Sequence, residues 1–328
     1  MFGRVEVRPL KPARSPELDR VLAGPAFAVD QIACSASARV LKALRVEAPA
    51  FESKRAPRAE LLYRIALAAV CHNINWDFLS ERLAGAFDEA PIDAKALSAV
   101  TARDIHAWLG GYNKPERIRA KERAALMRDL GAGLLRLYAG DVMCLLDDGG
   151  DRLYGPGGFL QRLDTFEAFR QDPLRKKSNV LVHEIVRDRV ATFLDQNKIA
   201  PAIDYHIMRL YLRSGRVVPL HRETMELLKH DSAPRPRLVR LLREAVAEAL
   251  SLTALYGQMS VPEVNGLEWQ IGRDICDRTK PRCTDVEAAV QTRLGLTSAL
   301  CPYAAACRAY GDLEWRALKE PDLKKSFY

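Results

Sequence analysis

Four cysteines near the C-terminal end of the sequence constrain its fold more than any other feature. They are spaced as Cys276-x6-Cys283-x17-Cys301-x5-Cys307, while the other three of the seven cysteines lie scattered through apolar stretches. Four thiolates held together in a reducing compartment typically bind zinc or an iron–sulfur cluster. Zinc sites favour about two to four residues between paired cysteines, and the longer gaps here suit loops that wrap round a cubane. The spacing therefore favours a [4Fe-4S] cluster over zinc or four unligated thiols.

The bulk composition is that of a globular protein without a membrane anchor. A chain of 328 residues can bury a sizeable core and form two domains. No run of about 18 to 20 apolar residues predicts a transmembrane helix, and the basic N-terminal segment lacks the apolar core of a secretory signal. In a reducing cytosol the seven cysteines are not expected to form a disulfide framework. We expect a cytoplasmic, monomeric protein with no membrane partner.

The net charge fits a polyanionic partner. Fifty basic residues against 42 acidic ones give a formal charge of +8. Lysine and arginine side chains that neutralise phosphates release counterions and so gain affinity for nucleic acid. Many basic proteins bind no nucleic acid, so the charge alone does not decide the matter.

Apolar residues recur with helical spacing along most of the chain. We expect helices at residues 29–44, 58–83, 114–140, 159–170, 174–194, 204–213, 221–229 and 235–257. Ser15 and Thr101 are predicted to begin two more, the second ending at Gly110-Gly111. Residues 145–158 are rich in Gly and Asp, which predicts a loop. No run of β-branched residues with period two demands a sheet, so we expect an all-α fold.

Two segments around the cysteines resemble a known family. LEWQIGRDICDRTKPRC (267–283) and CPYAAAC (301–307) are similar to the entry and exit of the cluster loop in endonuclease III-like DNA glycosylases of the helix-hairpin-helix superfamily. This resemblance implies two helical subdomains with an active-site cleft between them. It also implies a [4Fe-4S] cluster that is structural and docks DNA. The family has two residues between the second and third cysteines, and we expect the longer insert here to form a short helix.

Basic side chains accompany this loop. They are suited to phosphate contacts, although a solvated basic rim has the same appearance in the sequence. They are Arg273, Arg278, Lys280 and Arg282.

The segment PAIDYHIMRLYLRSG (201–215) resembles the family's catalytic motif. Asp204 matches the catalytic aspartate, and His206 and Arg209 match the motif histidine and arginine. Tyr205 replaces the usual threonine, and these three neighbours are candidate substrate-binding residues. Base removal passes through an oxocarbenium-like sugar, which one carboxylate can stabilise while it orients the nucleophile. The alternative is that Asp204 only caps a helix.

Upstream, DPLRKKSNVLVH (172–183) resembles the family's hairpin and following helix. Lys176 falls where bifunctional members carry a Schiff-base lysine, which implies a second catalytic residue. A nucleophilic lysine needs a depressed pKa, from burial or from flanking cations. The hairpin is degenerate, because Asp172-Pro173-Leu174 replaces the Gly-x-Gly whose backbone meets a DNA phosphate. A solvated face or a phosphate clamp is the alternative for these basic residues.

The N-terminal helices fit the same family pattern. AELLYRIALAAVCHNINWDFLSERL (59–83) resembles the helix and turn whose tip enters the duplex, with His72 at the inserted position. Asn75 and Trp76 are suited to reading or replacing a flipped base, although Trp76 equally suits a core.

The resemblance implies a division of the chain into three parts. Residues 1–57 would be a tail and helices that pack on the C-terminal domain, residues 58–203 a helical bundle with the degenerate hairpin, and residues 204–328 the catalytic-Asp helix and cluster domain. The implied activity is hydrolysis of an N-glycosidic bond, by a DNA glycosylase of base excision repair with DNA as partner. Two alternatives stay open. One is a queuosine-salvage-type N-glycosylase acting on a small modified ribonucleotide, which KKSNVLVHEIV and IDYHIMR also resemble. The other is a non-catalytic iron–sulfur protein that binds nucleic acid.

Overall fold

The computed structural model describes residues 25–44, 53–147, 151–172, 174–230 and 235–321. Seventeen α-helices, two 3-10 helices and one two-stranded ribbon make up the regular structure of these residues. The predicted predominance of helix is confirmed. Across the described ranges, every helix is too short or too polar to span a bilayer. The basic tail and the helix predicted from Ser15 lie outside the described residues.

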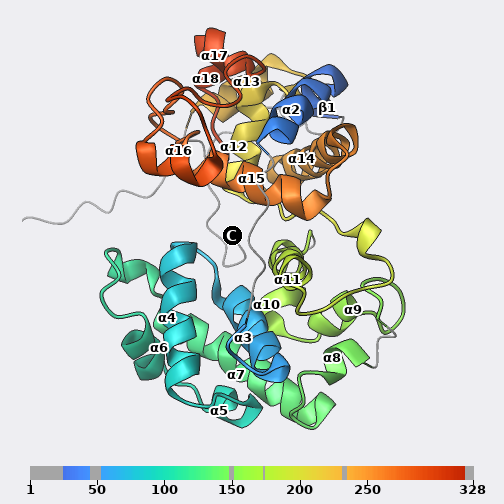
Figure 1. The fold of residues 1–328 in the computed structure, drawn as a ribbon, viewed down its shortest axis with the longest axis vertical. Coiled ribbons are helices and arrows are strands. Elements are labelled where there is room, and N and C mark those ends of the chain that lie inside the picture. The colour runs from blue at the N-terminus through green and yellow to red at the C-terminus, as the bar shows by residue number, and fades with distance from the viewer. Residues whose placement is uncertain (1–24, 45–52, 148–150, 173, 231–234, 322–328) are drawn as a thin grey trace, which may run out of the picture.

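The helices gather into two lobes, each with its own hydrophobic core (Figure 1). The core of the first lobe runs from Leu61 to Ile199, and α3 lies inside it with nearly all of its side chains buried. Its helices are α3 (Pro57–Val70), α4 (Trp76–Glu89), α5 (Ala94–Ser98), α6 (Ala102–Trp108), α7 (Ala120–Tyr138), α8 (Cys144–Asp147), α9 (Phe159–Leu163), α10 (Glu167–Arg170) and α11 (Lys176–Arg187), with 3-10 turns η1 (Pro115–Arg117) and η2 (Gln196–Lys198).

The second lobe combines the first described segment with the C-terminal half of the chain. Its core takes residues from 26–41 and from 203–318, so the chain enters this lobe, leaves it for the first lobe and returns. Its elements are β1 (Phe27–Val29), α2 (Gln31–Ala43), α12 (Tyr205–Ser214), β2 (Val217–Pro219), α13 (Arg222–Lys229), α14 (Pro236–Gly257), α15 (Val261–Asp274), α16 (Ala288–Leu294), α17 (Arg308–Gly311) and α18 (Leu313–Arg316).

The second lobe also contains a two-stranded sheet that the sequence did not predict. β1 and β2 pair antiparallel, with Phe27 opposite Pro219 and Val29 opposite Val217. Each strand has three residues, too few for an alternating pattern to be visible in the sequence. The pairing depends on two segments far apart in the chain.

Several helix boundaries follow from local capping. Thr101 forms a capping box with Asp104 at the start of α6, which confirms the predicted start. The helix expected across 58–83 is instead two helices, because Asn73 takes a positive φ of 55° and Asn75 caps α4. The insert between the second and third cysteines contains α16, as predicted.

Two ion pairs join the lobes. Arg243 of α14 forms a buried ion pair with Asp172, which precedes α11. Arg273 of α15 pairs with Asp77 of α4 at 3.0 Å, at a more exposed position. The contact between the lobes therefore contains one buried ion pair and one more exposed ion pair.

Candidate active site and cysteine cluster

Asp204 is fixed at the N-terminus of α12 and is 5 % exposed. Its Oδ1 accepts a hydrogen bond of 3.0 Å from the backbone N–H of Ile207, as an N-cap side chain does. Its Oδ2 accepts a hydrogen bond of 3.0 Å from Nε1 of Trp269, on α15. Two donors and the positive end of the helix dipole stabilise a carboxylate here. Asp204 is thus a helix cap whose charge is held in one orientation.

The motif arginine forms its ion pair with another carboxylate. Arg209 pairs with Glu320 at 2.7 Å, and among the described residues no ion pair involves Asp204. Arg209 also donates to the backbone oxygens of Cys276 and Gly272, at 2.6 and 2.8 Å. It is buried, and these contacts tie α12 to the start of the cysteine loop.

Aromatic rings lie beside the carboxylate. The rings of Tyr205 and His206 have centroids 4.1 Å apart, and His206 meets the indole of Trp269 edge-on at 6.3 Å. Burial lowers the pKa of His206, so its imidazole is neutral at neutral pH. Arg117 of η1, in the first lobe, interacts electrostatically with Tyr205. The basic segment of η1 therefore lies toward the Asp204 end of α12.

The carboxylate of Asp172 occupies the N-terminus of α11. Oδ2 of Asp172 accepts the backbone N–H of Lys176 at 2.8 Å, and Oδ1 that of Leu174 at 3.1 Å. Arg243 donates a hydrogen bond to each oxygen, at 2.8 and 2.9 Å. Burial alone would raise the pKa of Asp172, but Arg243 outweighs it and holds that pKa below its usual value. The anion position of this helix is therefore occupied by the chain itself.

The two lysines that begin α11 point into the first lobe. Nζ of Lys176 lies 3.8 Å from Sγ of Cys71. Nζ of Lys177 donates to the carbonyl of Ala69 at 2.7 Å and lies 3.5 Å from Nδ1 of His72. Burial lowers the pKa of Lys177 to about 8. The sequence did not single out Lys177.

His72 shares this buried polar group. It is fully buried, and its Nε2 lies 3.3 Å from Oε1 of Glu122. Its backbone oxygen accepts a hydrogen bond from the buried Arg123. Burial, followed by the charge of Lys177, lowers the pKa of His72, so that the ring is neutral. The structure places His72 inside the lobe, not on an exposed tip.

The neighbouring candidates occupy the start of α4. Asn75 is exposed and caps the helix, accepting a hydrogen bond of 2.9 Å from the N–H of Phe78. Its own N–H donates to the hydroxyl of Tyr112 at 3.0 Å. Trp76 is half-buried and packs against the first core. The structure thus gives both residues local structural contacts.

The four C-terminal cysteines converge. Each of their thiols interacts electrostatically with the other three, so all six pairs are neighbours. The N–H of Cys301 donates to the carbonyl of Cys283 at 2.9 Å, which joins the two ends of the long insert. All four are free thiols. Burial, together with the charge of Cys276, raises the pKa of Cys307 to about 11. The insert of seventeen residues therefore does not separate the cysteines.

The arrangement of the four thiols is not that of a single-ion site. Among the described residues, no three His, Cys, Asp or Glu side chains are grouped to hold one metal ion. A single zinc ion with Zn–S bonds of about 2.3 Å draws its sulfurs to within about 4 Å of one another. A four-iron cluster places irons and sulfides between its ligands, and therefore needs a wider tetrahedron of sulfurs.

The basic residues of this loop differ in their surroundings. Arg273 pairs with Asp77 and Asp274, Arg278 with Glu320, and Arg282 with Glu287. Lys280 is exposed at the loop surface. Most of the expected phosphate contacts are therefore engaged within the protein.

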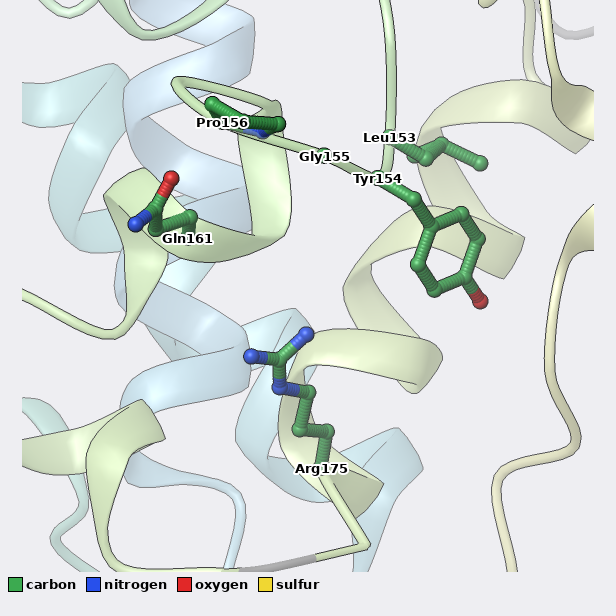
Figure 2. Close-up of a pocket in the computed structure, with 6 residues that line it drawn as sticks. All are labelled: Leu153, Tyr154, Gly155, Pro156, Gln161 and Arg175. Carbon is green, nitrogen blue, oxygen red and sulfur yellow. The ribbon is translucent and has the colours of Figure 1, made fainter.

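A pocket of about 280 Å³ adjoins the start of α11 (Figure 2). Arg175, Tyr154 and Gln161 are among the residues that line it. Arg175 has a positive φ of 51° as the N-cap of α11 and pairs with Asp164. The pocket offers an aromatic ring, a guanidinium and an amide to a small ligand.

The structure brings together Asp204, Tyr205, His206 and Arg209 and adds Trp269 as a donor to the carboxylate. In the sequence, Trp269 stands out only as part of the segment that leads into the cysteines. The contact depends on α12 and α15 packing side by side, which no local pattern specifies. The chain matches no known protein-family profile and no curated protein.

Proposed function

We propose that the protein is an iron–sulfur N-glycosidic-bond hydrolase that excises a modified or damaged base from DNA. The observation that carries this proposal is the carboxylate of Asp204. It is buried at a helix N-terminus, oriented by Trp269, and paired with no cation among the described residues. A fixed anion of this kind stabilises positive charge that develops on a substrate.

The reaction would follow from that charge. As the bond between C1′ and the base breaks, the sugar becomes oxocarbenium-like and the base leaves with the bonding electrons. Asp204 stabilises the cationic sugar and orients a water, whose oxygen bonds to C1′. The proton lost by the water balances the one taken up by the departing base. Trp269 keeps the carboxylate in place while the charge develops.

The four cysteines are proposed as the ligands of a [4Fe-4S] cluster. Their mutual proximity supports this, because four thiols that lie together can all lose their protons to one metal centre when it binds. The cluster, when bound, would supply a structural cross-link between the loop and α12, through Arg209 and the carbonyl of Cys276. We assign it no catalytic step.

DNA contacts are proposed for the exposed basic side chains around η1. Lys114, Arg117, Arg119 and Lys121 are all exposed, and the electrostatic contact of Arg117 with Tyr205 places this segment toward the candidate site. Such contacts are sequence-blind and salt-sensitive. The protein would act in the cytoplasm as a monomer.

A second candidate function is favoured by the start of α11. Asp172 occupies the helix end that would otherwise hold a DNA phosphate, and a pocket with Arg175 and Tyr154 lies nearby. An N-glycosylase that acts on a small modified nucleotide needs no backbone phosphate contact along a duplex. Its substrate would be a single nucleotide, with the same use of Asp204.

The test measures released base from two substrate sets, damaged duplex DNA and modified nucleotides, after anaerobic purification and assay of iron and sulfide. We expect about four of each per chain. Asp204→Asn retains size and capping ability but lowers base release by about 10² to 10³. Asp30→Asn is the matched control, because Asp30 also caps a helix of the second lobe but is exposed.

Borohydride trapping on the same substrate reports lyase chemistry. Lys176→Ala and Lys177→Ala are compared, and only the residue that forms a Schiff base should abolish trapping. Base release by Asp204→Asn at the wild-type rate would remove the central residue of the enzyme proposal. Release from nucleotides but not from duplexes would select the second candidate.

A further inference from the structure

Arg213 is a buried cation placed against the cysteine cluster. It lies on α12, one helical turn after Arg209, and is 2 % exposed. Its Nη1 approaches Sγ of Cys276 to 3.6 Å, and its own carbonyl accepts a hydrogen bond of 3.5 Å from Sγ of Cys307. Arg213 therefore contacts two of the four converging thiols from one side.

The remaining hydrogen bonds of Arg213 all go to backbone oxygens. Nη1 donates to Asp277 at 2.6 Å, Nη2 to Arg278 at 2.8 Å, and Nε to Leu318 at 2.8 Å. Through Arg213, these bonds connect the loop between Cys276 and Cys283 to the segment around Leu318. They satisfy the donors of the guanidinium but supply no opposite charge.

Two other buried arginines of this lobe each form an ion pair with a carboxylate. Arg209 pairs with Glu320, and Arg216 pairs with Glu268. In the described ranges no carboxylate forms an ion pair with Arg213. A buried charge is stable only when an opposite charge or strong hydrogen bonds compensate the loss of water. The position of Arg213 thus calls for an anion, and the adjacent group is the set of cysteine sulfurs.

We infer that Arg213 is the internal counter-charge of the cluster and sets its reduction potential. This rests on the proposed function, in that the four cysteines hold an iron–sulfur cluster. Four thiolate ligands carry more negative charge than the cluster core carries positive, so the whole group is an anion. A nearby cation and an N–H···S contact favour the more reduced, more negative state. Arg213 therefore raises the potential and opposes oxidation of the cluster. It is a positioning residue, because nothing places it at the substrate.

The test compares Arg213→Gln and Arg213→Lys in the full chain, purified anaerobically. Redox titration followed by electron paramagnetic resonance gives the midpoint potential, and loss of visible absorbance under ferricyanide gives the rate of oxidative breakdown. Arg213→Gln should shift the potential to more negative values and speed the breakdown several-fold. Arg213→Lys keeps the charge and should stay near wild type. Lys280→Gln removes one charge from an exposed position of the same loop and should change neither.

Each possible outcome either supports or overturns the role of Arg213. A wild-type chain that binds no iron overturns the cluster and, with it, the proposed function. A wild-type cluster whose potential is unchanged by Arg213→Gln overturns the role of Arg213 and leaves the cluster standing. If Arg213→Gln loses the cluster while Arg213→Lys retains it, the counter-charge is supported. Loss of the cluster in both variants shows that the hydrogen-bond geometry holds the loop, and overturns the charge assignment.

Discussion

Replacing Asp172 by alanine tests how much the buried ion pair with Arg243 contributes to the stability of the protein. The carboxylate has two functions, because it accepts the N–H groups of Leu174 and Lys176 and holds the guanidinium of Arg243 with both oxygens. Both side chains of the ion pair are nearly inaccessible, at 4 % for Arg243 and 2 % for Asp172. Substitution therefore leaves a buried guanidinium without this anion and uncaps α11.

The magnitude follows from that burial. Removing one partner of a buried ion pair typically costs about 3–5 kcal/mol, whereas a surface pair is worth about 0–1 kcal/mol. Loss of the helix cap alone costs about 0.5–2 kcal/mol. Since the same carboxylate performs both functions, we expect Asp172→Ala to lower the free energy of unfolding by about 4 kcal/mol. Asp172→Asn keeps an acceptor for the cap and should recover about 1 kcal/mol of this.

Urea unfolding followed by tryptophan fluorescence measures these differences. A double-mutant cycle with Arg243→Met isolates the pair, and the coupling energy should be about 2 kcal/mol. Arg240→Met is the control, since Arg240 lies on the same helix and its ion pair with Glu244 is exposed. A loss below about 1 kcal/mol for Asp172→Ala, equal to that of the surface control, would refute the reasoning.

Two further predictions concern the packing around the site. Burial lowers the pKa of His183 to about 4, and its Nε2 lies 2.9 Å from the carbonyl of Ala200. As the pH falls, His183 is protonated in the unfolded chain before it is protonated in the folded chain. The free energy of unfolding therefore decreases by about 3 kcal/mol between pH 6.5 and pH 4. His183→Gln should flatten that loss in unfolding curves measured across this range, and an unchanged slope would contradict it. Gly272→Ala places a Cβ 2.8 Å from the backbone oxygen of His206 and should cost about 1–3 kcal/mol in thermal unfolding. Gly266→Ala, on the same helix with open space around it, should be neutral or stabilising, and equal effects at both glycines would refute the close approach of α12 and α15.

The sequence by itself determined the helical class and many helix boundaries. Apolar periodicity and local capping are short-range properties, so the starts of α6, α13 and α14 could be read from neighbouring residues. The same holds for Asp204, whose capping role depends only on the three residues that follow it. The spacing of the cysteines favoured a shared site, but spacing did not show how the long insert folds back.

Only the tertiary structure decided which side chains meet. The partners of Asp204 and Asp172 are Trp269 and Arg243, each far away in the chain, and such pairs leave no periodic signal. Burial likewise lowered the pKa of Lys177 and placed His72 inside the first lobe, because exposure depends on what packs over a residue. The contacts of Arg213 with Cys276 and Cys307, on which its proposed role rests, also depend on the tertiary structure. A cation's need for an anion becomes visible only when the fold has removed the surrounding water.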